Sequence, residues 1–148
     1  MEMTTIKEAK INIFSVIENL DESGLVEGDA ERSESVATGY LHCFDDGVIL
    51  ITYAESQEGV SITSEIKYDD GRARVVRRGG IVSDIEFAEG QLHRSVYCVT
   101  PYSFDAEVKT KRVRCDMDSA GGRLDLLYDM KIGGATKKCR MTVKVEPI

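Results

Sequence analysis

Arg77 is the residue of this sequence best placed to do chemistry, because the pattern around it turns its side chain inward. A two-residue turn at Asp70-Gly71 sets a register in which Arg77 lies opposite Ser64 on an apolar face. A guanidinium among apolar neighbours needs a partner, and it can hold a carboxylate or phosphate by two parallel hydrogen bonds. The alternative is a structural arginine bonded to main-chain carbonyls across a barrel end, which is the commoner case. A three-residue turn, which fits the apolar pattern less well, would turn three other arginines inward instead: Arg72, Arg74 and Arg78.

Tyrosines and a histidine on the predicted inner faces could line a pocket together with Arg77. Such side chains combine an apolar body with one polar group, and they often orient small ligands in barrel mouths. We therefore take the following side chains as candidates for lining a ligand pocket: Arg77, Tyr40, His42, Ser64, Tyr68, Tyr97 and Tyr128. A tyrosine-rich core whose hydroxyl groups are all hydrogen-bonded is the alternative interpretation.

The sequence holds no recognisable catalytic or metal-binding motif. His42 and His93 are its two histidines, and neither has an acid or a nucleophile at a telling spacing. The sequence leaves open catalytic partners that are distant in the chain and meet only in the folded protein. The four cysteines have no CxxC spacing, and the chain has no GxGxxG, P-loop or HExxH motif. We therefore expect no metal and no cofactor.

Three functions are consistent with these residues. The first is non-enzymatic binding of a small amphipathic or anionic ligand inside a barrel cavity. The alternative is a hydrolase or isomerase that uses His42 and Arg77 in the same cavity. The third is a structural or interaction protein whose barrel is filled by its own side chains. A monomer and a homodimer are both compatible with the sequence.

Alternating apolar and polar residues predict strands along nearly the whole chain. Between 62 and 102, turn signals at Asp70-Gly71, Gly79-Gly80 and Glu89-Gly90 separate four short runs, the pattern of an antiparallel meander. Similar runs lie on both sides of it, at 10–18, 34–44, 48–54, 104–117, 123–132 and 139–145. So many strands predict an all-β fold, a single closed antiparallel barrel of about eight to ten strands that leaves no free edges. We expect less than about a tenth of the residues to be helical.

Several positions set the expected register. A change of apolar parity between Ile13 and Phe14 predicts a bulge or bend there, and a second change near Thr110 predicts a β-bulge. Gly80 is expected to take a positive φ in the turn after Arg78. The run 34–44 has one face that we predict to be the inner one: Val36, Thr38, Tyr40, His42 and Phe44.

The run 91–99 has two possible inner faces. A two-residue turn at Glu89-Gly90 would turn one set inward: Leu92, Arg94, Val96 and Cys98. A three-residue loop with a glycine bulge would turn the other set inward: His93, Tyr97 and Val99. Apolar content favours the first set.

Charge and composition limit the number of domains, the partners and the cellular location that we expect. The 148 residues predict one domain, 1–148, with a net charge of −7. Residues 18–34 carry seven carboxylates against Arg32 alone, so 19–35 is expected to be a flexible acidic loop. An acidic chain is a poor binder of nucleic acid, and the small basic clusters at 109–112 and 137–138 are interpreted as solvated sheet faces. With no apolar run near ~20 residues and no signal-peptide pattern, we expect no membrane partner and a cytoplasmic protein with four free thiols.

An ordered set of short stretches resembles a known family. The stretches are Val75-Val76-Arg77-Arg78-Gly79, Phe87-Ala88-Glu89-Gly90, Tyr97-Cys98-Val99-Thr100-Pro101-Tyr102 and Leu126-Leu127-Tyr128. They resemble the YwiB-like proteins, small bacterial proteins of unknown function with a calycin-type, lipocalin-like β-barrel. The resemblance covers roughly residues 36–146. It implies a barrel with an internal cavity and supplies no reaction and no ligand.

Overall fold

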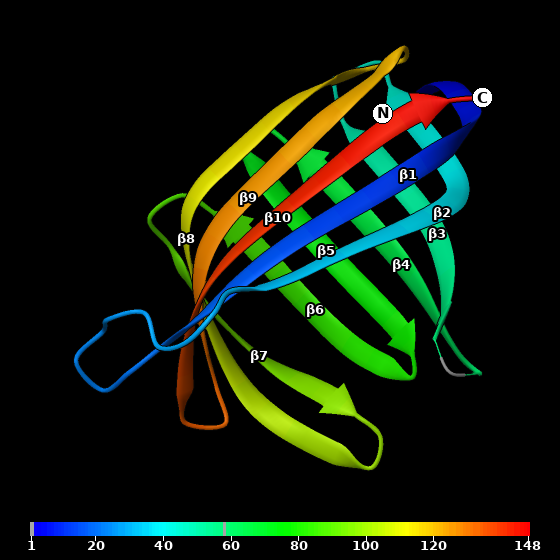
Figure 1. The fold of residues 1–148 in the computed structure, drawn as a ribbon. Coiled ribbons are helices and arrows are strands. Elements are labelled where there is room, and N and C mark those ends of the chain that lie inside the picture. Colours follow the sequence, from blue (N-terminus) through cyan, green and yellow to red (C-terminus); the bar gives the residue numbers. More distant parts are fainter. Residues whose placement is uncertain (1, 58) are drawn as a thin grey trace.

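The chain forms ten strands in the computed structural model, which describes residues 2–57 and 59–148 (Figure 1). In chain order they are β1 (Met3–Leu20), β2 (Glu31–Phe44), β3 (Ile49–Gln57), β4 (Val60–Asp69), β5 (Arg72–Gly79), β6 (Ile81–Ala88), β7 (Leu92–Val99), β8 (Tyr102–Asp118), β9 (Gly121–Ile132) and β10 (Ala135–Pro147). None of the described residues is helical. The described part accordingly contains no helix long and apolar enough to cross a membrane.

The strands close into one antiparallel barrel. Each strand pairs with its neighbours in the chain, and β1 pairs with β10 along Ala9–Pro147 to Leu20–Thr136 to complete the ring. Figure 1 shows both termini at one end of the barrel, and the β1–β2 loop and the β5–β6, β7–β8 and β9–β10 turns at the other. The predicted all-β closed barrel is confirmed.

Alternate residues of every strand except β7 form the buried interior of the described chain. Ile11, Leu41, Ile51, Leu124 and Val143 are each at most 1% exposed and form the centre of the core. Burying such side chains supplies the main favourable free energy of folding, at about 25 cal/mol per Å² of apolar surface.

The register around Arg77 agrees with the two-residue turn. Asp70 and Gly71 both have positive φ, 46° and 83°, and Ser64 pairs with Arg77 across β4 and β5. Gly79, with φ 108°, takes the left-handed conformation that was expected of Gly80. An added Cβ at Gly79 would lie 2.2 Å from the carbonyl oxygen of Ser61, so main-chain crowding also requires glycine there.

The inner face of β2 is the opposite of the predicted one. The inward residues are Ala37, Gly39, Leu41 and Cys43, so the face that contains Tyr40 and His42 lies outside. The reason is close approach of strands: a Cβ on Gly39 would lie 2.0 Å from the Thr52 carbonyl oxygen and 2.8 Å from Ile11 Cδ1. Small residues mark this inner face, and the pattern of large apolar residues pointed to the wrong side.

The first two strands are longer and more regular than predicted. β1 ends at Leu20 and β2 begins at Glu31, so the expected loop 19–35 shrinks to 21–30. Pairing is continuous through Ile13 and Phe14, and the bulge predicted there is absent. Phe14 is apolar but lies on the outer face, where the Lys144 ammonium sits 5.2 Å from its ring centroid. This contact explains why an apolar residue lies on the outer face, and why the change of apolar parity did not correspond to a bulge.

The β-bulge near Thr110 is present, between Thr110 and Arg112. Because of this bulge, Thr110 on its N-terminal side and Val113 on its C-terminal side both face into the barrel. Across the hairpins, Cys115 pairs with Leu124 and Cys139 pairs with Tyr128. All four cysteines are free.

Strand β7 is joined to β6 only at its C-terminal end. In the described residues, the main-chain pairings between the two strands are Ile81–Val99 and Val82–Cys98, both beside the β7–β8 turn. Leu92 and Val96 are about half exposed, at 53% and 51%, so the set favoured by apolar content faces outward. In the other set, His93 and Tyr97 are half-buried and Tyr97 faces the barrel interior, whereas Val99 is 40% exposed.

Candidate functional site

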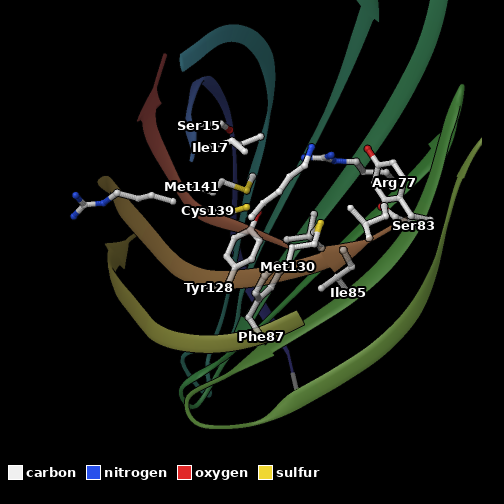
Figure 2. Close-up of a pocket in the computed structure, with 15 residues that line it drawn as sticks. Ser15, Ile17, Arg77, Ser83, Ile85, Phe87, Tyr128, Met130, Cys139 and Met141 are labelled. Carbon is white, nitrogen blue, oxygen red and sulfur yellow. The ribbon is translucent and has the colours of Figure 1, made fainter. Parts of the chain in front are cut away.

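A cavity of about 230 Å³ lies inside the barrel, toward the end that carries the β5–β6 and β9–β10 turns. Figure 2 shows Arg77 and Ser83 on one side of it and Ser15, Ile17, Cys139 and Met141 on the other, with Phe87, Tyr128 and Met130 between them. The side chains that line it come mainly from β1, β5, β6, β9 and β10.

Two inward-facing cations border the cavity. Arg77 lies on the inner face of β5, and Lys137 belongs to the inward set of β10 with Cys139 and Met141. Both are partly buried, and within the described residues neither forms an ion pair within 4 Å. Glu55 shares the inner face of β3 but does not line the cavity.

A row of hydroxyl groups surrounds Arg77. Tyr53, Ser64, Arg77 and Ser83 lie side by side across β3, β4, β5 and β6 on the inner face. The two serines are 3% and 5% exposed. Burial raises the pKa of the Tyr53 hydroxyl, and the positive charge of Arg77 offsets part of this rise. Arg77 is therefore surrounded by neutral groups that can donate or accept hydrogen bonds.

The floor of the cavity is apolar and uncharged. The rings of Phe87 and Tyr128 pack at 4.8 Å between centroids with a tilt of 57°. Burial raises the pKa of Tyr128, and it raises the pKa of Cys139 to about 11, although the charge of Lys137 opposes the second shift. Both groups are neutral near pH 7, so the charged side chains along the cavity wall are all positive.

The structure brings together some of the predicted site residues. Arg77, Tyr97 and Tyr128 line the cavity. Ser64 faces inward beside Arg77 but is not part of the lining, and Tyr68 packs on the core nearer the opposite end.

Tyr40 and His42 are wrongly placed by the sequence-based prediction, because both lie on the outer face of β2. Tyr40 is 49% exposed. The Nε2 atom of His42 lies 3.3 Å from the Thr52 hydroxyl, and burial lowers the pKa of this imidazole. His42 and Arg77 are therefore on opposite sides of the barrel wall and do not form one site.

Lys137 is the main residue that sequence reasoning missed. It was interpreted as part of a solvated basic pair with Lys138. Extending the alternation of Cys139 and Met141 by one step places it inside, so the signal was present in the parity of β10. Lys138, the next residue, is exposed and lies opposite Asp129 of β9. As for metals, the described residues contain no group of three or more His, Cys, Asp or Glu side chains that could hold an ion.

Comparison with known proteins places the chain in a family. The model of a domain of unknown function, DUF1934, matches residues 20–143. The chain belongs to this family. It is 26% identical over 123 residues to the "Uncharacterized beta-barrel protein YwiB" of Bacillus subtilis (strain 168), which covers 83% of this chain and 81% of that protein. The resemblance to YwiB-like proteins is thus confirmed.

The fold is also that of a solved structure. The crystal structure of the ywiB protein from Bacillus subtilis superposes with a TM-score of 0.84, covering 99% of this chain and 95% of that one at 23% identity. At this identity the match establishes the shared barrel and carries no argument about a ligand.

Proposed function

We propose that this protein is a non-enzymatic binder of a small anionic, amphipathic molecule, held in the barrel cavity. The observation that carries the proposal is the pair of inward cations, Arg77 and Lys137, above an apolar floor with no carboxylate in the described lining. Two like charges in a partly desolvated space repel each other, and an anion bound between them is attracted to both.

The cavity sets the size and orientation of the ligand. Its volume of about 230 Å³ is below the ~300–1,000 Å³ of pockets for drug-sized molecules. A single carboxylate or phosphate group with a short hydrocarbon or aromatic portion fits this space. The acidic group lies between Arg77 and Lys137, where the hydroxyls of Ser15 and Ser83 are also within the lining, and the apolar part contacts Phe87 and Met130.

The other two functions have less support. The hydrolase or isomerase hypothesis required His42 and Arg77 in one cavity, and they lie on opposite faces of the wall. The cavity itself counts against a barrel filled by its own side chains. The four free thiols, of which Cys43 and Cys139 are buried, suit a reducing compartment and support the proposal of a cytoplasmic protein.

Native mass spectrometry of freshly purified protein tests this function. We expect a co-purified small molecule, or saturable binding of octanoate or octyl phosphate, on the wild type. Arg77→Met and Lys137→Met should each weaken binding at least about tenfold, equivalent to ~1.4 kcal/mol. Arg78→Met is the matched control, because Arg78 is the adjacent residue and lies outside, 3.6 Å from Glu65.

Two results would contradict the proposal. One is that neither probe binds the wild type and no molecule co-purifies with it. The other is that Arg77→Met and Arg78→Met bind equally well, which would mean that the inward guanidinium has no part in recognition.

A further inference from the structure

A second group of arginines surrounds a hollow on the outer face of the barrel, over β8, β9 and β10, the yellow to red strands of Figure 1. The hollow has a volume of about 200 Å³. Its lining contains four arginines, one carboxylate and two leucines: Arg112, Arg114, Arg123, Arg140, Asp125, Leu126 and Leu127. Arg140 also borders the internal cavity, but its exposure and its place in β10 put its side chain outside.

The β-bulge of β8 creates this arrangement. Before the bulge, the even-numbered residues Val108 and Thr110 face inward, and after it the odd-numbered residue Val113 does. Without the extra residue, Arg112 and Arg114 would continue the inward set and lie in the core. The bulge turns both arginines outward, so a local irregularity of the strand assembles the cluster.

Strand pairing brings the arginines to one place. Arg112 and Arg140 are both paired with Leu127, one from each side, and Arg114 is paired with Asp125. Neighbouring strands are ~4.8 Å apart, so the backbones of Arg112 and Arg140 are about 10 Å apart. Arginine side chains are long enough to meet above Leu127 across that distance.

Most of this positive charge is not neutralised by the protein. Arg123 donates to both oxygens of Asp125 at 2.6 and 3.1 Å, and the Thr142 hydroxyl donates to the same carboxylate at 2.7 Å. In the described part of the chain, Arg112, Arg114 and Arg140 form no ion pair within 4 Å. Other exposed arginines do pair: Arg72 with Glu86, Arg74 with Asp84, Arg78 with Glu65 and Arg94 with Glu107.

Asp125 holds the hollow in shape. Burial would raise the pKa of this carboxyl, but the hydrogen bonds from Arg123 and Thr142 and the charges of Arg123 and Arg140 hold it below its usual value. The carboxylate is therefore ionised and fixed at neutral pH. Three guanidinium groups remain around the hollow with their hydrogen-bond donors available.

We propose that this hollow binds the phosphate or diphosphate group of a small phosphorylated molecule. Planar guanidinium groups match phosphate oxygens in pairs of hydrogen bonds, and three of them supply the charge for a di- or trivalent anion. A nucleic-acid track is the less fitting partner, because carboxylates interrupt the basic face on both sides: Asp129 and Glu107 toward one end and Asp116 and Glu146 toward the other. Lys109, Lys111 and Lys138 lie on the same face, but Asp129 is paired with Lys109 and Lys138 across the strands and forms an ion pair with Lys111 at 3.2 Å. The three arginines without an ion pair are thus a separate cluster on a chain of net charge −7.

A titration of the folded protein with inorganic pyrophosphate, followed by amide chemical shifts, tests the site. We expect saturable shifts at Asp125 and Leu127. Arg112→Gln and Arg140→Gln should each weaken binding about tenfold, equivalent to ~1.4 kcal/mol. Arg140→Lys keeps the charge but loses the planar fork, and it should weaken binding by an intermediate factor. Arg78→Gln, an exposed arginine on β5, is the control and should leave binding unchanged.

Several outcomes would overturn the proposal. They are the absence of saturation, shifts confined to cavity residues such as Ser83, and equal weakening in Arg78→Gln. A single-stranded oligonucleotide that binds more tightly than pyrophosphate, through Arg112 and Arg140, would also overturn it in favour of a nucleic-acid surface. Melting curves of the variants establish that they are folded, since all the substituted side chains are exposed.

Discussion

The arginines on the two faces of β5 differ in whether a carboxylate lies beside them. On the outer face, each arginine has a carboxylate on a neighbouring strand, such as Arg72 with Glu86 at 3.1 Å and Arg78 with Glu65 at 3.6 Å. On the inner face, Arg77 lies between Ser64 and Ser83. The outer arginines are therefore satisfied within the chain, whereas the inner one has its charge directed at a cavity. This contrast is the basis of our proposal that the cavity binds an anionic ligand.

The largest expected effect is on the free energy of unfolding, and it comes from the difference in packing between the inner and outer faces of the barrel wall. Ile66, opposite Val75 on the inner face, is 1% exposed, so Ile66→Ala should destabilise the protein by about 2–5 kcal/mol. Glu65→Ala on the outer face should cost less than about 1 kcal/mol, since exposed ion pairs contribute little. Urea unfolding of both variants measures the difference. Equal costs would mean that the inner face of β4 and β5 is not a packed core.

Thiol reactivity should also distinguish inside from outside. Because burial raises the pKa of Cys139 to about 11, roughly a thousandth of it is thiolate at pH 8, so native-state alkylation should be slow. Cys98, on the outer face of β7, should react at least about tenfold faster. Time-resolved mass analysis with iodoacetamide gives both rates, and denatured protein without reductant should take up four labels. A Cys139 rate equal to that of Cys98 would contradict the buried cavity wall.

A smaller effect is expected from Arg77→Met without ligand. Since no carboxylate lies within 4 Å of Arg77 in the described residues, the variant should lose no stability and could gain up to about 1 kcal/mol. Thermal melting of ligand-free protein measures this. A loss of about 3–5 kcal/mol would instead reveal a buried carboxylate left without its partner.

The smallest effect concerns the outer face and acid pH. The hydrogen bonds from Arg74 lower the pKa of Asp84 below 3.8, although burial opposes the shift. A carboxyl with a lowered folded-state pKa stabilises the protein above its unfolded-state pKa, and the stabilisation is lost as the pH falls through the folded-state value. Both side chains are about half exposed, so the contribution is below ~1 kcal/mol.

The variant Arg74→Gln tests the direction of this dependence of stability on pH. The variant should be less stable than the wild type at pH 7, and the two should converge near pH 2. Urea unfolding at both values measures it. A difference that grew on acidification would mean that the Arg74–Asp84 pair does not stabilise the fold.

Local turn chemistry and alternation made much of this barrel predictable. The positive-φ turn at Asp70-Gly71 placed Arg77 inside, and the parity change near Thr110 located the bulge. Both signals depend only on residues close together in the sequence. The first signal predicted one of the two inward-facing cations that border the cavity, and the number of alternating runs along the chain predicted the closed barrel.

Two of the errors came from the way neighbouring strands meet, and a third came from the local pattern. Gly39 faces inward because β1 and β3 approach it closely, which no local pattern reveals. The face of β7 was reversed because that strand separates from β6, so its apolar residues are not buried. Lys137 was missed because two adjacent lysines were interpreted as equally solvated, although alternate strand residues face opposite ways.

The separation of β7 from β6 has a mechanical consequence. Beyond their two paired positions, the strands are joined at the Asp84 carbonyl, which accepts a hydrogen bond from the Ser95 hydroxyl at 2.9 Å and lies 3.3 Å from His93 Nε2. In the described residues, every other pair of neighbouring strands shares five or more paired positions. We therefore expect the β6–β7 junction to open more easily than the rest of the wall. Opening there would move Tyr97, which borders the cavity, relative to Ser83 and Ile85.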